Sequence, residues 1–487
     1  MLNKTIPAYQ LWWFAGFALF SLACILGAFA LEQYLALAVP VVLLFGYVAF
    51  INYKAIYWLL LFTLPLSTEL DIGSIGLDMP DELLMVSLMF ITLLAILGKP
   101  QLLDFRFAKH PIMLLLFTHF FLVVLLIPYS ENGLVTIKYA LSKLWFYVPF
   151  LILTSMVIKE EADLRKFFWY IFFPMTFTVL YVLVRYAGYG FSFEEVNKPM
   201  YPFYRNHVSY ACMITIFYPF IWLAATWYQP GTWKKRILQW SKWLYLIAIY
   251  FSYTRACYLA IAAIAVCYVI IHRDLLRQVL LAALTLVVLG VGYLAHDNNY
   301  LDFAPEYTKT VYHTEFGDHL RATVSLQDVS SMERVYRWVA AFRMISDRPV
   351  TGFGPGNFYP YYMRYTVSDF RTYTSDNPER STAHNYFLLT LVEQGLPGLF
   401  IFLLTSLAIF FYGQQAYARA TDPVQRKVIM TTMLALVCVY VNLLLSDMIE
   451  TDKVGSLYYM SIAIMVVFAI KVQESYQKRL KKGENEA

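Results

Sequence analysis

Hydrophobic residues recur in long runs along most of this chain, with short polar segments between them. An α-helix advances about 1.5 Å per residue, so about 20 apolar residues cross a hydrocarbon layer about 30 Å thick. A soluble fold could not bury so many such runs. We therefore expect an all-α polytopic membrane protein with about 12 to 14 transmembrane helices and one large, partly helical loop outside the cytoplasm.

The candidate spans number fourteen. They cover residues 11–31, 34–51, 54–66, 83–98, 111–128, 144–158, 167–187, 208–228, 240–253, 256–271, 277–295, 397–413, 427–446 and 456–471. The third, sixth and ninth of these runs are short, and if they are tilted, half-inserted or re-entrant the count falls to twelve. The first run ends near Ala28-Phe29-Ala30, which looks like a signal-peptidase site. We interpret the run as the first span, because it is too long for an ordinary signal sequence and its positive flank is weak.

Lysine and arginine orient the spans, because they are enriched in cytoplasmic loops. The tail after Ile470 is rich in both residues, which favours the cytoplasm for the C-terminus. Counting back from there, the inner segments hold seventeen Lys and Arg, whereas the short outer turns hold seven. Both termini are therefore predicted to be cytoplasmic, with the segment 296–383 outside.

This interpretation divides the chain into four parts. They are an N-terminal transmembrane region over residues 1–295, the outer loop with its candidate motifs over 296–396, a C-terminal transmembrane region over 397–471, and a cytoplasmic tail over 472–487.

Composition agrees with a membrane protein and excludes other classes. The chain is 60% hydrophobic and only 15% charged, with a mean hydropathy of +0.54, whereas soluble domains are nearer 25% charged. The five cysteines lie in apolar runs without C-x-x-C spacing, so neither a disulfide framework nor a zinc site is expected. No nucleic-acid-binding signature is present.

The large outer loop is expected to fold, because it is neither of low complexity nor rich in glycine and serine. It carries eight arginines and one lysine against eleven acidic residues. Ser330-Ser331-Met332-Glu333 is typical of a capping box and predicts a helix over about 331–346. That helix would place Val335, Val339 and Phe342 near one face.

Four groups of polar residues lie on the predicted outer side. They are Ser252-Tyr253-Thr254-Arg255; Glu333-Arg334 with Arg337-Trp338, followed by Asp347-Arg348-Pro349 and Gly352 to Gly356; Ala383-His384-Asn385, ahead of Glu393, Gly395 and Gly398; and Arg205-Asn206-His207. Each has an ordinary explanation: Arg255 would snorkel to lipid headgroups, His384 would cap a helix, and the loop arginines would form a solvated helix face. The glycine run lacks the Gly-Lys-Ser/Thr ending of a nucleotide-binding loop.

Together, these groups indicate phosphate binding outside the cytoplasm. Arginine outnumbers lysine eight to one in the loop, and guanidinium binds phosphate in a bidentate way while keeping its charge. Several arginines and a histidine at the outer surface suit a lipid-anchored phosphate or pyrophosphate beside a proton acceptor. The chain has no Asp-x-Asp pair for a divalent cation, so we expect arginine rather than a metal ion to neutralise the phosphate.

On these motifs the chain resembles the O-antigen ligase and O-antigen polymerase superfamily of bacterial envelope glycosyltransferases. The matching elements, in order, are Ser252 to Arg255, the helix with Glu333, Arg334 and Trp338, the turn from Arg348 to Asn357, and His384 to Gly398. Asn206-His207 matches more weakly. The strong resemblance covers roughly residues 240–400, and Thr254 replaces the commoner serine.

The resemblance implies transfer of a glycan from undecaprenyl pyrophosphate to an acceptor hydroxyl at the periplasmic face of the bacterial inner membrane, without nucleotide, metal ion or cofactor. His384 matches the proposed catalytic histidine, while Arg255 and Arg334 match arginines proposed to bind the pyrophosphate. The further candidates for substrate binding are Arg337, Arg205, His207, Asn385 and Arg348.

The leading interpretation is an O-antigen ligase, which joins completed polysaccharide to lipid A-core within the bilayer. An O-antigen or exopolysaccharide polymerase and a protein O-oligosaccharyltransferase share the donor chemistry and differ in the acceptor. A polysaccharide flippase or transporter would also suit the span count. Transporter sites, however, usually lie near the membrane midplane, whereas these charged groups lie at the predicted outer surface.

Overall fold

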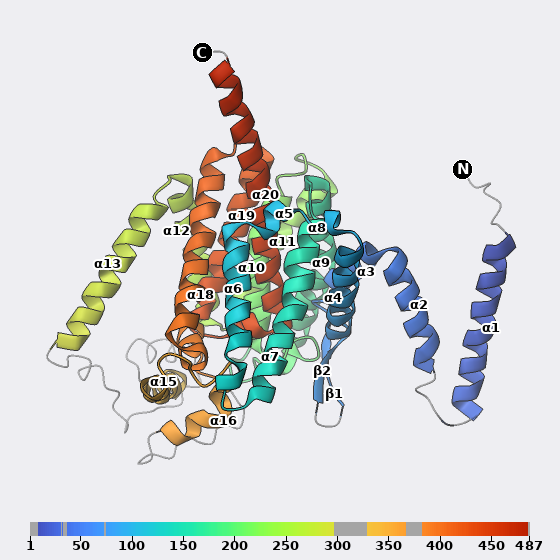
Figure 1. Ribbon diagram of the computed structural model, residues 1–487, viewed down its shortest axis with the longest axis horizontal. Coiled ribbons are helices and arrows are strands. Elements are labelled where there is room, and N and C mark those ends of the chain that lie inside the picture. Colours follow the sequence, from blue (N-terminus) through green and yellow to red (C-terminus); the bar gives the residue numbers. More distant parts are fainter. Residues whose placement is uncertain are drawn as a thin grey trace.

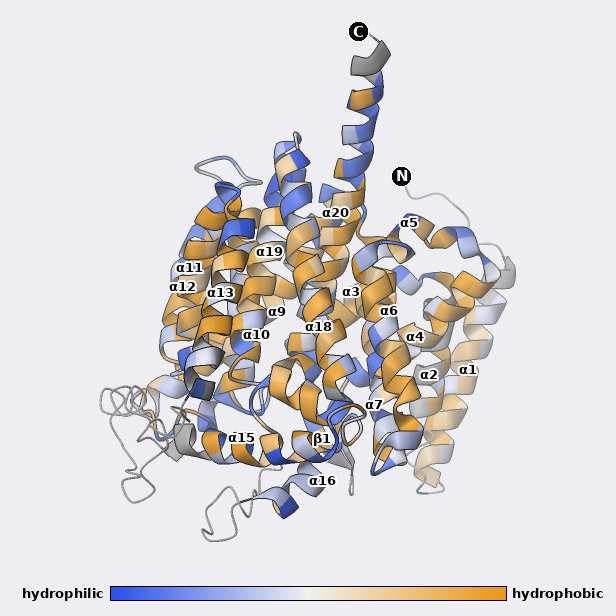
Figure 2. Ribbon diagram, turned by 60° about the vertical axis from the view of Figure 1, so that its left-hand side comes forward, coloured by the Kyte–Doolittle hydropathy of each residue, from blue (hydrophilic) through white to orange (hydrophobic). Residues whose placement is uncertain are grey.

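A computed structural model describes residues 8–30, 32, 37–72, 75–296, 329–366 and 382–485. Within these ranges the chain is mostly helical, and its central helices form an upright bundle (Figure 1). Apolar residues cover the bundle helices, whereas hydrophilic residues gather towards the two ends (Figure 2). The predicted all-α polytopic membrane protein is confirmed.

The described helices and strands follow one another in a simple order. They are α1 (Ala8–Ala30), α2 (Ala38–Ile51), α3 (Tyr53–Thr63), β1 (Thr68–Ile72), β2 (Ile75–Met79), α4 (Asp81–Gly98), α5 (Phe105–Ala108), α6 (Pro111–Leu125), α7 (Gly133–Phe146), α8 (Thr154–Val157), α9 (Glu161–Ala187), α10 (His207–Ala224), α11 (Trp233–Tyr250), α12 (Arg255–His272), α13 (Leu276–Ala295), α15 (Val329–Asp347), α16 (Phe358–Tyr362), α18 (Tyr386–Arg419), α19 (Pro423–Leu443) and α20 (Asp452–Asn485).

Nine helices in the described part of the chain are long and apolar enough to cross a membrane, and two shorter apolar helices, α6 and part of α13, accompany them. This is fewer than the predicted twelve to fourteen. The predicted spans 34–51 and 54–66 form α2 and α3, of 14 and 11 residues. The predicted short run 144–158 instead belongs to one continuous span, Gly133–Val157, in which a π-helical segment joins α7 to α8. Hydropathy identified the apolar runs, but the length and continuity of the helices decide which of these runs can cross a membrane.

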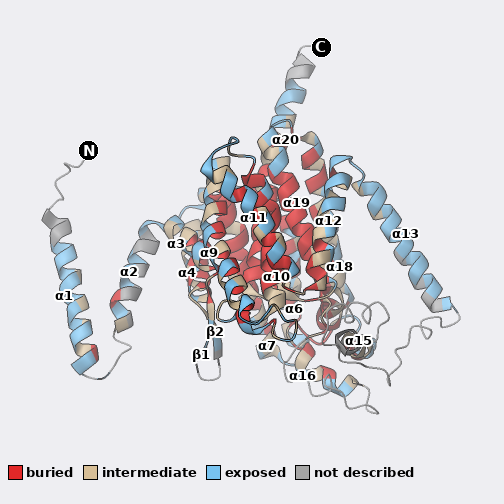
Figure 3. Cartoon of the chain, turned by 180° about the vertical axis from the view of Figure 1, so that it is seen from behind, coloured by how far each residue is buried: buried red, intermediate tan, exposed pale blue. Residues whose placement is uncertain are grey.

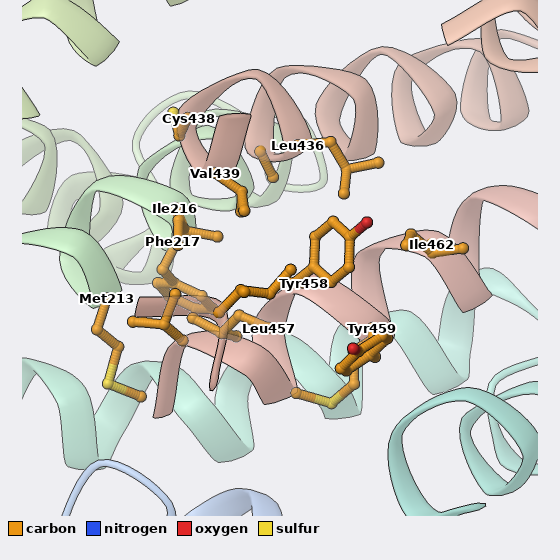
Figure 4. Close-up of a cluster of buried hydrophobic side chains, with 14 of the residues drawn as sticks. Met213, Ile216, Phe217, Leu436, Cys438, Val439, Leu457, Tyr458, Tyr459 and Ile462 are labelled. Atoms are coloured by element: carbon orange, nitrogen blue, oxygen red, sulfur yellow. The ribbon is translucent and has the colours of Figure 1, made fainter. Parts of the chain in front are cut away.

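The core lies where α10, α19 and α20 pack together, the most deeply buried part of the chain (Figure 3). Figure 4 shows side chains of these three helices meeting at their shared interface: Met213, Ile216, Phe217, Leu436, Cys438, Val439, Leu457, Tyr458, Tyr459 and Ile462. Helices α1 and α13 stand apart from this bundle and expose most of their described side chains. A continuous helical core of this kind gives the polar loops at its ends a fixed base.

The two ends of the bundle carry different elements of the chain. The start of α1 and the end of α20 lie at one end, and α15, α16 and the β1–β2 hairpin lie at the other (Figure 1). The hairpin is antiparallel and pairs Glu69 with Asp78, and its strands were not predicted from the sequence. We call the end that carries α15 the site end.

Helix α15 confirms the predicted helix over 331–346, and it lies across the site end of the bundle (Figure 2). The side chains of the predicted capping box, 330–333, lie outside those that the structure describes. The side of α15 that packs inward is not the one with Phe342, which is 59% exposed, but the one with Ala340, Ala341 and Met344, which are fully buried. Small residues form the inner face because α15 packs closely against α18.

Helix α18 contains a sharp kink at Gly395, whose φ of +68° is rarely adopted by residues with a side chain. A Cβ at Gly395 would lie 2.1 Å from the carbonyl oxygen of Val350. The backbone N–H of Leu396 donates to Pro349 O at 2.8 Å across the same contact. The kink therefore lets the segment after α15 pack directly against the α18 backbone.

Candidate active site

Helix α15 is fastened to the segment that precedes α18. Arg337 is only 2% exposed, and its guanidinium donates to Thr382 O at 3.3 Å. The indole N–H of Trp338 donates to Ala383 O at 3.0 Å. Two predicted motifs that are far apart in sequence therefore meet directly beside His384.

His384 directly follows these contacts and has an unusual backbone conformation. Its φ of +49° falls in the left-handed region, which costs a non-glycine residue about 1–3 kcal/mol and persists only where the surroundings enforce it. Burial, together with the positive charges of Arg337 and Arg334, lowers the pKa of His384 to about 3. The ring is therefore neutral at physiological pH, the state in which an imidazole accepts a proton.

A second loop, residues 444–450 between α19 and α20, holds both sides of His384. Asp447 Oδ2 accepts a hydrogen bond from the Thr382 hydroxyl at 2.7 Å, and Leu444 O accepts one from Asn385 Nδ2 at 3.1 Å. Glu450 Oε1 accepts a third from the Tyr386 hydroxyl at 2.6 Å. We call this segment the anchor loop. It supplies the constraints that the strained backbone of His384 requires.

Burial affects the acidic residues of the anchor loop differently. It raises the pKa of Asp447, against the opposing effect of the Thr382 hydrogen bond. It would also raise the pKa of Glu450, but the charge of Lys143 and hydrogen bonds from Lys143, Tyr386 and Tyr139 outweigh burial and hold that pKa below its usual range. Glu450 is therefore a firmly ionised carboxylate close to His384.

Arg255 lies in the turn of α12 that contacts the helix before the anchor loop. Arg255 is the first residue of α12, and two residues later the Cys257 thiol donates to Asn442 Oδ1 at 3.5 Å. Asn442 lies just ahead of the anchor loop, so the first turn of α12, which begins at Arg255, contacts the helix that leads into this loop. The convergence of Arg255 with His384 stays a prediction.

The Arg205-Asn206-His207 motif forms the start of α10. Arg205 is exposed, and Asn206 caps the helix by accepting from the Ser209 N–H at 2.9 Å. The ring of His207 donates to Asn197 Oδ1 at 2.8 Å. The prediction that Arg205 and His207 bind substrate stays a prediction, with the His207 ring engaged in a local contact.

Two other predicted binding residues are held by the protein itself. Asn385 caps α18, because its Oδ1 accepts from the Leu388 N–H at 2.9 Å. Arg348 forms an ion pair with Glu131, and its guanidinium stacks over the ring of Phe353 at 5.2 Å. These contacts give both residues a structural explanation, and their binding of substrate stays a prediction.

The glycines between Gly352 and Gly356 allow close packing of the backbone. Gly352 has a φ of +63°, and a Cβ there would lie 2.4 Å from the carbonyl carbon of Glu393 in α18. The backbone N–H groups of Phe353 and Gly354 donate to Val392 O and Glu393 O at 3.0 and 2.8 Å. The glycines therefore allow two backbones to touch, which explains why this motif accompanies the Gly395 kink.

Sequence reasoning missed Asp447, Glu450 and Lys143. The first two lie in a short polar segment between two apolar runs, and Lys143 stands at the edge of another. Charged residues at the ends of spans were a usable signal, because such charges are costly to bury and are usually functional or paired. Their spatial relation to His384 required the fold.

Residues 240–403 match a family model described as O-antigen ligase. This part of the chain is similar to that family. The match confirms the predicted resemblance to the O-antigen ligase superfamily, and it supports a ligase-type or polymerase-type function. No curated protein matches the chain. The matched region includes Arg255, Arg334, Arg337, Arg348 and His384, whereas α7 and the anchor loop lie outside it.

Proposed function

We propose that this protein transfers a glycan from undecaprenyl pyrophosphate to a hydroxyl of lipid A-core at the periplasmic face of the inner membrane. The observation that carries the proposal is the neutral, constrained His384 beside Arg334 and Arg337, inside the region that matches the family model. Both termini would be cytoplasmic, in keeping with the position of the start of α1 and the end of α20 at the end opposite α15 (Figure 1). Arginine, rather than a metal ion, would neutralise the pyrophosphate.

The reaction requires one proton acceptor and stabilisation of one leaving group. His384 takes the proton of the acceptor hydroxyl as its oxygen forms a bond to the anomeric carbon of the donor sugar. The bond between that carbon and the pyrophosphate oxygen breaks with inversion, and undecaprenyl pyrophosphate leaves with the bonding electrons. Arg255 and Arg334 stabilise the charge that develops on the leaving group.

Replacing Arg255 with lysine keeps the charge and removes the planar pair of donors. We expect Arg255→Lys to lower the transfer rate about 10²-fold, because a single ammonium group cannot reproduce bidentate phosphate contact. Arg273→Lys, just beyond the other end of α12, is the matched control and should keep wild-type transfer. Radiolabelled transfer in isolated membranes measures both, and full activity of Arg255→Lys would reduce Arg255 to a headgroup anchor.

The pH dependence of kcat/KM should reflect a histidine whose pKa is lowered by burial. The ordinary imidazole pKa is 6.5, and burial with the Arg337 and Arg334 charges lowers that of His384 to about 3. Acid protonates the base and stops transfer, so kcat/KM should stay level from pH 7 to about pH 5 and fall only at lower pH. Initial rates at low donor concentration over pH 4–8 test this, and a half-maximal point near pH 6.5 would contradict it.

The acceptor is tested by the envelope glycan profile of a deletion strain complemented with the wild-type chain. Full-length polymer accumulating on undecaprenyl pyrophosphate, with bare lipid A-core, is the result expected for a ligase. A single repeat unit on lipid A-core would instead assign the chain as a polymerase, with the same chemistry and another acceptor. A normal profile in the deletion strain would overturn both.

A further inference from the structure

One carboxylate oxygen receives three hydrogen bonds at the site end of the bundle. Glu450 Oε1 accepts from Lys143 Nζ at 2.7 Å, from the Tyr386 hydroxyl at 2.6 Å and from the Tyr139 hydroxyl at 3.0 Å. We call these four residues the Glu450 cluster. Its members come from α7, α18 and the anchor loop, so the cluster joins three separate parts of the chain.

The Lys143 side chain is only 2% exposed, although lysine is rarely buried without a partner. Pairing with Glu450 compensates the charge, and the ammonium group also donates to the Tyr459 hydroxyl at 3.3 Å. A buried ion pair seldom adds net stability over an apolar pair, so its presence points to a requirement for defined geometry.

Helix α7 also contacts the turn from Arg348 to Asn357, which we call the glycine turn, through a neighbouring residue. The Thr136 hydroxyl donates to Pro355 O at 3.1 Å and accepts from Asn357 Nδ2 at 3.0 Å. Thr136, Tyr139 and Lys143 are spaced three or four residues apart, so they share one face of α7. One helix face therefore contacts both the glycine turn and the carboxylate that holds Tyr386.

Tyr386 is the first residue of α18 and follows His384 by two positions. We propose that the Glu450 cluster positions His384: Lys143 holds Glu450, Glu450 holds Tyr386, and Tyr386 fixes the start of α18 and hence the aim of the imidazole. Lys143, Tyr139 and Glu450 are positioning residues that do not touch substrate. The inference rests on the proposed function of His384 as the proton acceptor.

The test removes one hydroxyl. Tyr386→Phe should lower kcat about 10- to 10²-fold, because a small misplacement of a reacting group costs up to about that much. The KM for the lipid-linked donor should stay unchanged. The pH at which kcat/KM falls should rise. A His384 side chain that is no longer held in place gains contact with water, and its distances to the charges of Arg334 and Arg337 of α15 and of Asp447 of the anchor loop are no longer fixed. Tyr57→Phe is the matched control, since Tyr57 is a fully buried tyrosine whose hydroxyl bonds to Thr154 at 2.9 Å.

A second variant separates geometry from charge. In the double variant Lys143→Met with Glu450→Gln, the amide oxygen still accepts from Tyr386 while both buried charges are gone. We expect its kcat to lie below that of wild type, because Lys143 no longer holds the side chain at position 450, but within about 10-fold of it and above that of Tyr386→Phe, because the contact with Tyr386 remains. A folded double variant as slow as His384→Ala would overturn the inference, because charge rather than the Tyr386 contact would then matter.

The outcomes also separate this inference from the proposed function. Wild-type kcat and an unmoved pH profile in Tyr386→Phe, with His384→Ala inactive, would overturn the positioning role alone. Retained transfer in His384→Ala would overturn the function of His384 and the inference with it. Thermal unfolding of each purified variant shows whether a lost rate reflects lost protein.

Discussion

Replacing His384 with alanine should lower glycan transfer by about 10²- to 10⁴-fold, the usual contribution of a positioned general base. The structure gives the reason: the imidazole is neutral because burial and two arginines lower its pKa to about 3, and its backbone is held in a strained conformation by contacts on both sides. Alanine meets the same backbone strain, so the fold should persist. Transfer of a radiolabelled lipid-linked glycan in isolated membranes measures the loss.

The matched control for His384→Ala is His272→Ala. His272 lies at the far end of α12 from Arg255, is exposed, and contacts the Tyr417 hydroxyl at 3.0 Å. The His272→Ala variant should transfer glycan at the wild-type rate. Near-wild-type transfer by His384→Ala, at equal protein content, would mean that the base is another group.

Gly395→Ala should remove most of the folded protein from the membrane. Its φ of +68° strains any residue with a side chain by about 1–3 kcal/mol. The new Cβ would also lie 2.1 Å from Val350 O, which forces the backbones of α18 and the glycine turn apart. Together with overpacking costs of about 1–3 kcal/mol, this is a large share of a typical total stability of about 5–15 kcal/mol.

The amount of detergent-extracted, monodisperse protein and its melting temperature measure this effect. Gly290→Ala in α13 is the control, because a Cβ there meets nothing within 4 Å. It should leave both quantities unchanged. A Gly395→Ala variant that folds and melts like wild type would contradict the close contact between the kink and the glycine turn.

The sequence predicted the membrane fold for a clear physical reason. Long apolar runs have few uses outside a bilayer, and arginine-rich segments with a histidine indicate phosphate chemistry wherever they meet. Arg337 and His384 are brought together through Thr382, as the ordered motifs suggested. In the described part of the chain nine helices are long and apolar enough to cross a membrane, and hydropathy alone did not reveal where each of them ends or continues.

The anchor loop and the Glu450 cluster could not be found from the sequence. Asp447 and Glu450 are ordinary acidic residues of a short turn until α18 and α7 are placed beside them. Likewise, nothing local indicated that Arg348 would pair with Glu131 or that Gly352 would touch α18. These contacts join segments far apart along the chain, and their partners are set by the packing of the whole bundle.

The most direct test of the account is reconstitution of the purified chain in liposomes with radiolabelled undecaprenyl-pyrophosphate glycan, lipid A-core and a metal chelator. We predict that label moves to lipid A-core, that undecaprenyl pyrophosphate is released in equal amount, and that His384→Ala forms neither product. Passage of the lipid-linked glycan across the liposome membrane without any acceptor product would contradict the account and assign the chain as a transporter.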